Sequence, residues 1–568
     1  MKPRRLDKIF VLIAVLLLAG QFALQLYLAN RDSQTTDEAV HLLAGYTYLT
    51  KHDFRFNPEH PILVKALAAT PLLFMDVKLP SDFDQLWDKS SDFFYDSWRE
   101  NRLLGENFLY QSGNDPQKIL FWGRFPVVVL TFLLGLSILL ASRKLFSAAG
   151  ALITVSLYVF NPIVLAHGHL ITTDIAVALG YFLATLAAFS FFKKQSWQSF
   201  VLLTLGVSFA LLIKFTAIIL IPAIIVLFIY SCLSGILKKG ERLKIFGLLV
   251  AVALSSWLLV WACYGFETSK IPKVDSISQT MIDRNSQTTK TEVSKSQQSK
   301  FDKIVSSTSV AMVPRDYFKG LFMVITHVEN GHDSYLLGQL SKKGWWYYFP
   351  VVFVAKNPIP TVILLAISVY CVFVFKRKRV LNLFLLISAM SFLLVAMTSK
   401  ANLGVRHIMP VIPLLIILTA NLVDVKSRQI RVFVIILIAW LVFDVVSTFP
   451  YYLSYFNQIF GGRDSGYKIA SDSNLDWGRD LKDVATYIRS HEMSPLYVEY
   501  GWDGPSSLQY YGINHEDGSM VNKNTIGYLV IGGSAVDSEE FSWLNSLAIY
   551  DKITPSVFVY KLNGTFNE

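Results

Sequence analysis

Apolar runs long enough to cross a lipid bilayer recur along the whole chain of 568 residues. A transmembrane helix needs roughly 17–25 predominantly apolar residues. The runs predict about eleven such helices, at residues 9–28, 119–141, 148–165, 175–192, 197–213, 217–234, 245–263, 350–375, 380–398, 408–423 and 432–449. The charged fraction of 17% is below the roughly 25% of soluble proteins, so we expect an α-helical polytopic membrane protein. The first run has no small-residue cleavage site and is too long for a signal-peptide core, which predicts a retained span.

Basic residues indicate how these spans are oriented. With the N-terminus in the cytoplasm, six short cytoplasmic segments hold nineteen Lys and Arg residues, whereas the short outer loops hold Lys214, Lys400 and Arg406. This asymmetry is typical of the positive-inside rule. It predicts a multi-pass protein of the plasma (inner) membrane with a cytoplasmic N-terminus. The loops account for the net charge of +10, which therefore does not indicate a nucleic-acid partner.

Three longer regions fall outside the membrane in this topology. Residues 30–118 and 264–349 are expected to be external loops of a transmembrane domain that covers residues 1–449, with helices in the first loop. Residues 450–568 are expected to form a small α/β extracytoplasmic domain, because a stretch with helical spacing at 476–490 is followed by strand-like runs. Those runs lie at residues 496–500, 526–531 and 557–560.

The unusual polar residues of the chain gather on the predicted outer side. They are Asp37, Glu38, His41, Glu59, His60, Lys65, His167, His169, Asp174, Lys214, Arg406 and His407. A transporter or flippase would place its ionisable residues near the bilayer midplane, and a non-catalytic membrane scaffold would leave them without a shared purpose. At the membrane surface a carboxylate can take a proton from an acceptor hydroxyl, while Lys or Arg can hold a phosphate. The distribution therefore favours an enzyme.

Each of these residues also has an ordinary structural interpretation. Thr35-x-x-Glu38 matches a helix capping box, and Asp37 in a first turn complements the helix dipole. Asp174 is placed to cap the start of a span, and Lys214 is placed to extend toward the membrane interface. The residue types alone do not decide between the two interpretations.

His167-Gly168-His169 has the alternation of some metal sites. Two imidazoles need further ligands to hold a metal, so hydrogen-bonded loop histidines are the competing interpretation. Participation of a divalent metal stays open on the sequence alone, and no other cofactor is indicated.

Seven short segments carry a resemblance to a known family. They are Asp37-Glu-Ala-Val-His41, Asn57-Pro-Glu-His-Pro-Ile-Leu-Val-Lys65, Ala166-His-Gly-His-Leu-Ile-Thr-Thr-Asp174, Lys214-Phe-Thr216, Gly344-Trp-Trp-Tyr-Tyr-Phe-Pro350, Asn402-Leu-Gly-Val-Arg-His-Ile-Met-Pro410 and Asp472-Ser-Asn-Leu-Asp-Trp-Gly478. In type and order they resemble segments of the C-type glycosyltransferases. The resemblance is to the protein O-mannosyltransferase-like group (glycosyltransferase family 39) and the related aminoarabinose transferases of lipid A.

The resemblance implies transfer of one sugar, mannose or a similar one, from a polyprenyl-phosphate carrier to an acceptor hydroxyl on the outer face. Asp37 would be the general base or would orient the acceptor, and Asp174 would shape the sugar or acceptor site. Lys214 and Arg406 would hold the lipid phosphate as it leaves. The acceptor would be a protein, a lipid or a glycan, with a cell-surface glycan or lipid A as the alternative to protein. Residues 264–349 do not resemble the β-trefoil domain of the eukaryotic enzymes, which disfavours a eukaryotic-style protein acceptor.

Further residues of the matching segments complete the predicted substrate-binding set. They are Glu38, His41, Glu59, His60, His167 and His407. A neutral imidazole is not a fixed cation, which weakens a phosphate-binding role for His60. The aromatic residues of the C-terminal region are expected either to form a core or to stack on a sugar. They include Trp477, Trp502, Tyr510 and Tyr511.

Overall fold

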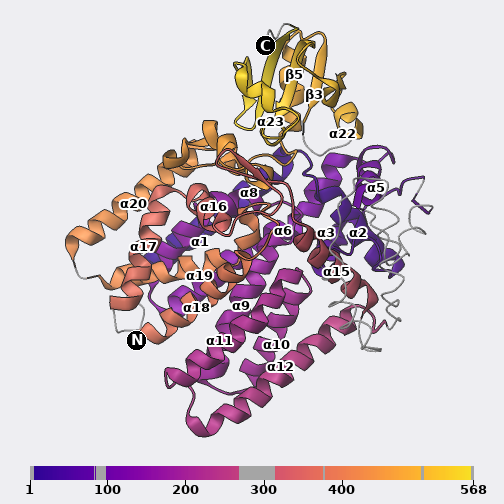
Figure 1. Cartoon of the computed structure of the whole chain (residues 1–568). Helices are drawn as coiled ribbons and strands as arrows, with labels where there is room; N and C mark the ends of the chain where they lie inside the picture. Colours follow the sequence, from indigo (N-terminus) through magenta and orange to yellow (C-terminus); the bar gives the residue numbers. More distant parts are fainter. Residues whose placement is uncertain are drawn as a thin grey trace.

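The computed structural model describes residues 5–81, 83–84, 98–267, 314–374, 378–425, 427–500 and 505–564, and it is mostly helical (Figure 1). Among these residues, seven helical segments are long and apolar enough to cross a membrane. They are α1 (Arg5–Arg31), α6 (Pro116–Leu145), α9 (Asp174–Lys193), η2 with α11 (Phe215–Leu233), η3 with α12 (Lys239–Cys263), α18 (Arg379–Ala396) and α20 (Arg428–Ser447). The prediction of an α-helical polytopic membrane protein is confirmed.

The remaining predicted spans are helical but shorter or bent. The shorter ones are α7 (Ala148–Val159), α10 (Trp197–Leu211) and α19 with η5 (Val411–Asp424). The bent one consists of α16 (Tyr348–Lys356) and α17 (Ile359–Val374), and the chain bends by 119° between them. All eleven predicted segments thus contain helix, but the predictions at 148–165 and 350–375 missed a break.

Asn-Pro sequences explain both breaks. Asn357 precedes Pro358 and has an extended backbone, with φ −103° and ψ 141°, because a residue before proline avoids the α region. Asn161 precedes Pro162 and is extended for the same reason. Its side chain accepts hydrogen bonds from the next free backbone N–H groups and so starts a new short helix, α8 (Pro162–His167). This second helix turns the chain toward the His167 segment.

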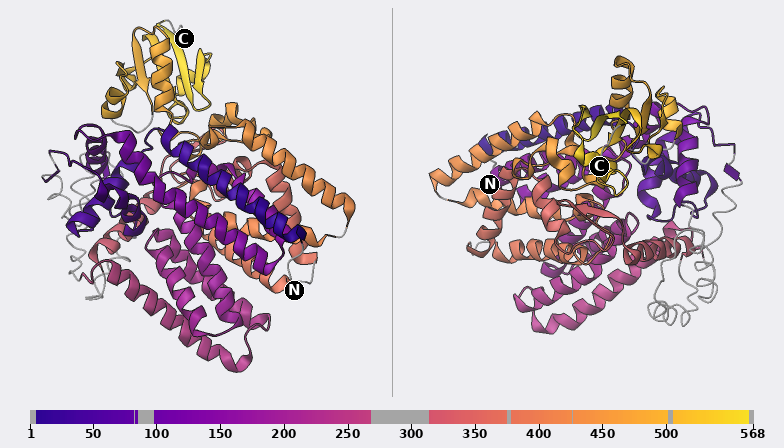
Figure 2. Two further views of the ribbon diagram at one scale, coloured as in Figure 1. Left: turned by 180° about the vertical axis from the view of Figure 1, so that it is seen from behind. Right: turned by 45° about the horizontal axis from the view of Figure 1, so that its top comes forward.

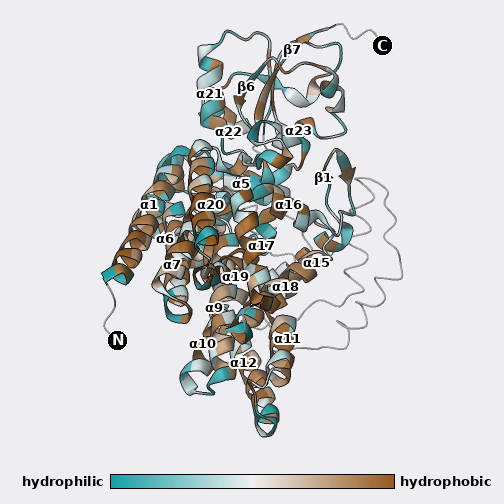
Figure 3. Ribbon diagram, turned by 90° about the vertical axis from the view of Figure 1, so that its left-hand side faces the viewer, coloured by the Kyte–Doolittle hydropathy of each residue, from teal (hydrophilic) through white to brown (hydrophobic). Residues whose placement is uncertain are grey.

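The long helices pack into one bundle with a shared apolar core. α1 packs against α6 and α7, and α17 packs against α20. α9 packs against α10, α10 against α12, and α11 against α18. Figure 2 shows α1 and α6 side by side, and the ribbon in Figure 3 is mostly coloured as hydrophobic along these helices and more mixed in the C-terminal part.

The helices expected within residues 30–118 are present as α2 (Glu38–Lys51), α3 (Ile62–Ala69) and α5 (Trp98–Tyr110). α2 and α3 approach so closely that a Cβ atom on Gly45 would lie 1.9 Å from the carbonyl oxygen of Lys65. Glycine is therefore required at this position. The close approach holds the segment that ends at Lys65 against the helix that starts beside Asp37.

The C-terminal part contains the expected strands in a five-stranded mixed sheet, in the order β4-β3-β5-β7-β6. The strands are β3 (Leu496–Glu499), β4 (Glu516–Asp517), β5 (Ile526–Gly532), β6 (Asp551–Thr554) and β7 (Val557–Asn563). β3 runs parallel to β4 and β5, whereas β7 is antiparallel to β5 and β6. Along β7, Val557 and Val559 join one apolar cluster and Phe558 and Tyr560 the other, as the two-residue period of a strand requires. Both faces of the sheet are therefore covered.

The chain between α20 and the sheet packs on the helical bundle. Leu453, Phe456 and Trp477 belong to the same apolar cluster as the long helices. The first cluster under the sheet starts at Leu481, in α21 (Leu481–Ser490). The domain division at residue 450 stays a prediction, and the residues just after it pack into the apolar core of the helical bundle.

A small hairpin, which the sequence did not predict, packs on the same segment. It consists of β1 (Ser334–Leu336) and β2 (Gln339–Ser341). The backbone N–H of Leu337 donates to the carbonyl of Ile469 at 2.9 Å. The hairpin therefore lies between the helical bundle and the sheet.

Candidate active site

Three charged side chains from distant parts of the chain meet at one point. Asp37 directly precedes α2, Asp174 is the first residue of α9, and Arg406 lies in η4 (Val405–Ile408). Nη1 of Arg406 is 3.5 Å from Oδ2 of Asp37 and 3.6 Å from Oδ2 of Asp174. Arg406 thus lies between the two carboxylates.

A fourth residue, Lys214, completes this arrangement, which we call the charged cluster. Lys214 directly precedes η2 (Phe215–Ile219), and its Nζ is 2.5 Å from Oδ1 of Asp174. The side chain of Asp174 has no exposed surface, and that of Lys214 is 5% exposed. A buried carboxylate needs such a partner, because an unpaired buried charge is costly. Two cations therefore face two carboxylates.

Asp37 is the most accessible member of the charged cluster. Its side chain is 26% exposed, against 10% for Arg406. It stands at the N-cap position of α2 but makes no capping hydrogen bond. A small cleft beside it, with a volume of about 10 Å³, is lined by Thr36, Val40, His41, Asn57, Glu59 and Arg102. The carboxylate of Asp37 therefore faces a cleft and does not cap the helix.

The segment Asp472–Gly478 holds Arg406 in place. Oγ of Ser473 accepts a hydrogen bond from Nε of Arg406 at 3.0 Å and donates to the carbonyl of Leu403 at 2.7 Å. The guanidinium lies 4.1 Å from the ring centroid of Trp477, a distance typical of a cation–π contact. Trp477 is buried in the apolar core of the helical bundle and not in the core of the C-terminal sheet, and Trp502 lies outside the described residues.

Glu38, next to Asp37, has a different environment. Its carboxylate is fully buried and accepts hydrogen bonds from Nε and Nη2 of Arg124 at 2.8 and 2.6 Å. It also accepts from the backbone N–H groups of Thr35 and Ile171. Burial acts to raise the pKa of Glu38, but Arg124 outweighs burial and holds the pKa below its usual range. Glu38 thus makes the glutamate half of the predicted capping box and anchors Arg124 inside the protein.

The two residues of the His-x-His pattern have different surroundings. Nδ1 of His169 is 2.9 Å from Oε1 of Gln25, and its Nε2 is 3.0 Å from Oδ2 of Asp32. His167 is buried beside Trp477, and burial lowers the pKa of His167 to about 3. Within the described residues, no group of three or more His, Cys, Asp or Glu side chains is arranged to hold a metal ion.

Two further predicted residues, His41 and His60, lie beside the charged cluster. Nδ1 of His41 donates to the carbonyl of Ile171 at 2.7 Å, and the His41 and His60 rings are in edge contact at 5.6 Å. Burial, and next the charge of Lys214, hold the pKa of His60 well below its usual range. Burial also lowers the pKa of His41, so the surroundings of both imidazoles favour the neutral form.

Some polar atoms around the charged cluster lack a hydrogen-bond partner among the described residues. They are Nδ1 of His60, Nε2 of His407 and Oδ2 of Asp174. Buried polar atoms are usually paired, and an unpaired group calls for an explanation such as a bound ligand or water. The two histidine nitrogens are therefore open to a hydrogen bond from a substrate or water, whereas Oδ2 of Asp174 faces Nη1 of Arg406 at 3.6 Å.

The sequence argument missed Arg124, Asp32 and Ser473. Arg124 lies inside the predicted span 119–141, and a charged residue in such a run is itself a signal of a specific partner. Asp32 pairs with Arg479 at 3.3 Å, a contact between residues 447 positions apart. No local pattern predicts a contact of that kind.

Comparison with known protein families gives one match. Residues 118–261 match the family model described as dolichyl-phosphate-mannose-protein mannosyltransferase. The segment covers about a quarter of the chain, from α6 to α12, and it contains Asp174 and Lys214. The match confirms the predicted relationship to the C-type glycosyltransferases. Comparison with curated proteins gives no significant match.

Several solved structures have a similar arrangement of elements. ArnT from Cupriavidus metallidurans bound to undecaprenyl phosphate is 12% identical with a TM-score of 0.49, over 96% of this chain and 97% of that chain. The apo oligosaccharyltransferase from Archaeoglobus fulgidus is 12% identical with a TM-score of 0.47, over 93% and 71% of the two chains. AglB from Archaeoglobus fulgidus in complex with an inhibitory peptide and a dolichol-phosphate is 12% identical with a TM-score of 0.46, over 93% and 72%.

Proposed function

We propose that the protein is an integral membrane glycosyltransferase that moves a sugar from a polyprenyl-phosphate donor to an acceptor hydroxyl. The observation that carries the proposal is the charged cluster, in which Arg406 lies between Asp37 and Asp174 while Lys214 pairs with Asp174. A carboxylate beside fixed cations is the combination that proton removal and phosphate departure both require. The family match over residues 118–261 supports the same reaction class.

Asp37 is the proposed general base, because it is the most exposed carboxylate of the charged cluster and faces the cleft. The acceptor oxygen forms a bond to the anomeric carbon of the sugar while the bond from that carbon to the phosphate oxygen breaks. The acceptor proton passes to Asp37, and the electron pair of the broken bond leaves with the phosphate. Asp174 fixes the two cations and so shapes the sugar site.

Arg406 and Lys214 are the proposed phosphate-binding residues. The hydrogen bonds of Arg406 to described residues use Nε and Nη1, which leaves Nη2 for a phosphate oxygen. Lys214 has three donors, one of which points to Asp174. The unpaired Nε2 of His407 and Nδ1 of His60 would bind uncharged parts of the substrate. Glu59 and His41 line the cleft or its edge and are proposed to contact the donor.

The proposed donor sugar is mannose or a similar hexose or pentose, and the proposed acceptor is a protein, a lipid or a glycan. We further propose that the reaction takes place on the outer face of the inner membrane, with the N-terminus in the cytoplasm. The positive-inside asymmetry of the short loops supports this orientation. Glu38 is proposed to act through Arg124 and the start of α2 and to make no direct contact with substrate.

The test is a transfer assay with purified protein and a panel of polyprenyl-phosphate sugars, with products identified by mass spectrometry. The Asp37→Asn variant should lose activity by about 100- to 10,000-fold, the usual contribution of a general base, while it still inserts and purifies normally. Asp84→Asn, at an exposed carboxylate of the same external region, is the matched control. Normal turnover by Asp37→Asn, or no transfer from any donor by the wild type, would overturn the proposal.

A further inference from the structure

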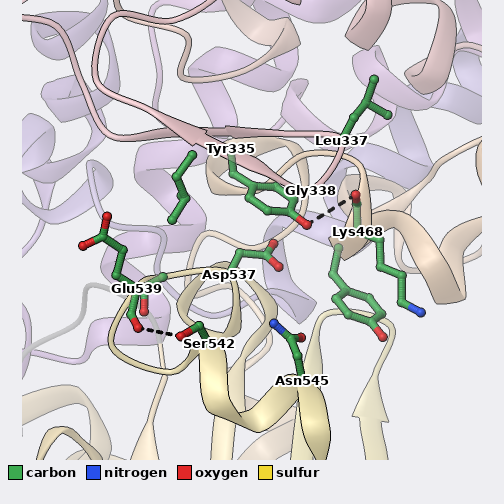
Figure 4. Close-up of a pocket in the computed structure, with 11 residues that line it drawn as sticks. Tyr335, Leu337, Gly338, Lys468, Asp537, Glu539, Ser542 and Asn545 are labelled. Carbon is green, nitrogen blue, oxygen red and sulfur yellow. Dashed lines mark hydrogen bonds between the residues drawn. The ribbon is translucent and has the colours of Figure 1, made fainter.

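A second cavity lies away from the charged cluster, between the β1–β2 hairpin and the C-terminal sheet (Figure 4). Its volume is about 540 Å³, within the size range of sites for small organic ligands. Tyr335 and Leu337 line it from the hairpin, Lys468 from the connecting segment, and Asp537 and Asn545 from the C-terminal part. In Figure 4, Asp537 lies between Tyr335 and Asn545. Three segments of the chain therefore build this cavity together.

Asp537 is the feature that points to a ligand. It is 9% exposed, and its Oδ2 has no hydrogen-bond partner among the described residues. Burial raises the pKa of Asp537 to about 8, so the carboxyl is mostly protonated at neutral pH. A protonated carboxyl both donates and accepts hydrogen bonds, as a sugar hydroxyl does. Ser538, beside it, also has an Oγ without a hydrogen-bond partner in the part of the chain that the structure describes.

The remaining lining combines aromatic and apolar groups with neutral polar ones. Tyr335 and Tyr467 supply aromatic rings, and Leu337 and Leu340 are exposed at 50% and 45%. Leu337 has φ 50°, a backbone conformation that a bulky side chain rarely adopts, and such outliers concentrate at functional sites. Asn545 adds an amide that can donate and accept. A few polar groups among apolar walls are typical of a small-molecule site.

The charges of the cavity disfavour an anionic ligand. Lys468 brings one positive charge and Glu539 one negative charge, while Asp537 is held neutral. No excess of cations is present in this lining to bind a phosphate. Neutral polyhydroxyl compounds, which present both hydroxyls and apolar C–H faces, match the combination of rings, amide and neutral carboxyl.

We propose that this cavity binds a neutral saccharide, as a second binding site for the acceptor. The acceptor assignment rests on the proposed transfer function, whereas saccharide binding does not. Lys468 in the cavity wall is five residues from Ser473, which contacts Arg406. Five residues span at most about 18 Å of extended chain, so Lys468 in the cavity wall lies within that distance of the residue that holds Arg406. A glycan of several sugar units held here would be long enough to extend from the cavity toward the charged cluster.

The test measures binding of maltotriose, chitotriose and α-linked mannotriose to the full-length protein by ligand-observed NMR and calorimetry. Tyr335→Leu removes one aromatic wall, and Asn545→Ala removes an exposed amide without disturbing the core. Gln509→Ala, an exposed amide of α22 (Pro505–Tyr510) outside the cavity, is the matched control. The Asp37→Asn variant reports whether saccharide binding is independent of transfer.

At least one trisaccharide should bind the wild type, the control and Asp37→Asn equally. Tyr335→Leu and Asn545→Ala should each weaken binding by about tenfold, which corresponds to about 1.4 kcal/mol. Absence of binding at millimolar concentration for all three sugars, unchanged binding in both cavity variants, or binding of an unglycosylated peptide in place of the sugars would overturn the proposal. Transfer activity without trisaccharide binding would refute this site alone, and binding without any transfer would refute the proposed function alone.

Discussion

The guanidinium of Arg406 lies over the indole ring of Trp477, with 4.1 Å between Cζ and the ring centroid. The contact joins the 3-10 helix that carries the phosphate-binding candidate to the segment that leads into the C-terminal sheet. Ser473, four residues before Trp477, holds Nε of the same guanidinium. The segment Asp472–Gly478 therefore has a physical role in the site, which is to orient Arg406.

Replacement of Trp477 by leucine should weaken use of the donor, because Arg406 loses one of the contacts that orient it. A cation–π contact contributes about 0.5–2 kcal/mol, so the apparent KM for the polyprenyl-phosphate sugar should rise by about 2- to 30-fold. Steady-state kinetics with varied donor measure this change. Trp346→Leu, at an exposed tryptophan, is the control, and an unchanged donor KM in Trp477→Leu would deny the contact a functional role.

Replacement of Arg406 itself should weaken the apparent affinity for the polyprenyl-phosphate donor more than that for the acceptor. Arg406→Ala removes the N–H groups proposed to bind the phosphate. Arg406→Lys should restore little of the lost activity, because lysine lacks the planar guanidinium that binds phosphate in a bidentate manner. Separate titrations of donor and acceptor in the transfer assay measure the two effects. Equal apparent donor affinity in Arg406→Ala and wild type would contradict the assignment.

Local patterns predicted most of the helices and the strands. Each predicted span contains helix because its apolar run is longer than the apolar runs found in loops. The runs at 496–500, 526–531 and 557–560 form β3, β5 and β7 because they are short stretches rich in apolar residues. The breaks at Asn161 and Asn357 were readable from the prolines that follow, but continuous hydropathy outweighed that signal.

The site was less accessible to sequence reasoning. Asp37, Asp174 and Arg406 meet across separations of more than one hundred residues. The predicted topology placed them on one side of the membrane, but their separate roles were expected only from the family resemblance. The cavity that contains Asp537 depends on the β1–β2 hairpin, which has three-residue strands and no alternating pattern long enough to detect. Contacts of this kind depend on how the elements pack and leave no periodic trace.

Removal of one partner of the Asp174–Lys214 pair should destabilise the protein. Both side chains are buried, and loss of one partner leaves an uncompensated charge at a cost of about 3–5 kcal/mol. Lys214→Met should therefore lower the thermal unfolding temperature in detergent more than Lys214→Met combined with Asp174→Asn. Thermal scans of both variants measure the difference, and equal destabilisation would contradict a tight coupling of the two residues.

Glu38 and Asp37 should respond differently to the same substitution. Glu38→Gln weakens the paired hydrogen bonds to buried Arg124, so unfolding should become easier by about 3–5 kcal/mol while the donor KM of the folded fraction changes little. Asp37→Asn should show the reverse, with loss of transfer at normal stability. Unfolding curves and kinetics on the same preparations separate the two roles, and a large KM effect in Glu38→Gln at normal stability would place Glu38 at the substrate instead.

Stability should depend on pH through Asp537. Burial raises the pKa of Asp537 from 3.8 to about 8, so between these pH values the unfolded chain has lost a proton that the folded protein keeps. The free energy of unfolding therefore falls as pH rises through this window, by at most about 1.4 kcal/mol per pH unit. The stability that is lost in this way is fully present only below about pH 4, where the carboxyl is protonated in both the folded and the unfolded chain.

Asp537→Asn has no proton to lose and should be more stable than the wild type. Its advantage in unfolding temperature should be smallest near pH 4, grow toward pH 8 and stay constant above it. Thermal unfolding of both proteins across this range measures the difference, with Asp333→Asn, at an exposed carboxylate, as the control. A pH-independent difference would mean that the carboxyl of Asp537 is ionised in the folded protein. A buried carboxyl that lowers the free energy of unfolding near neutral pH is what we expect of a group whose proposed role is to bind a saccharide.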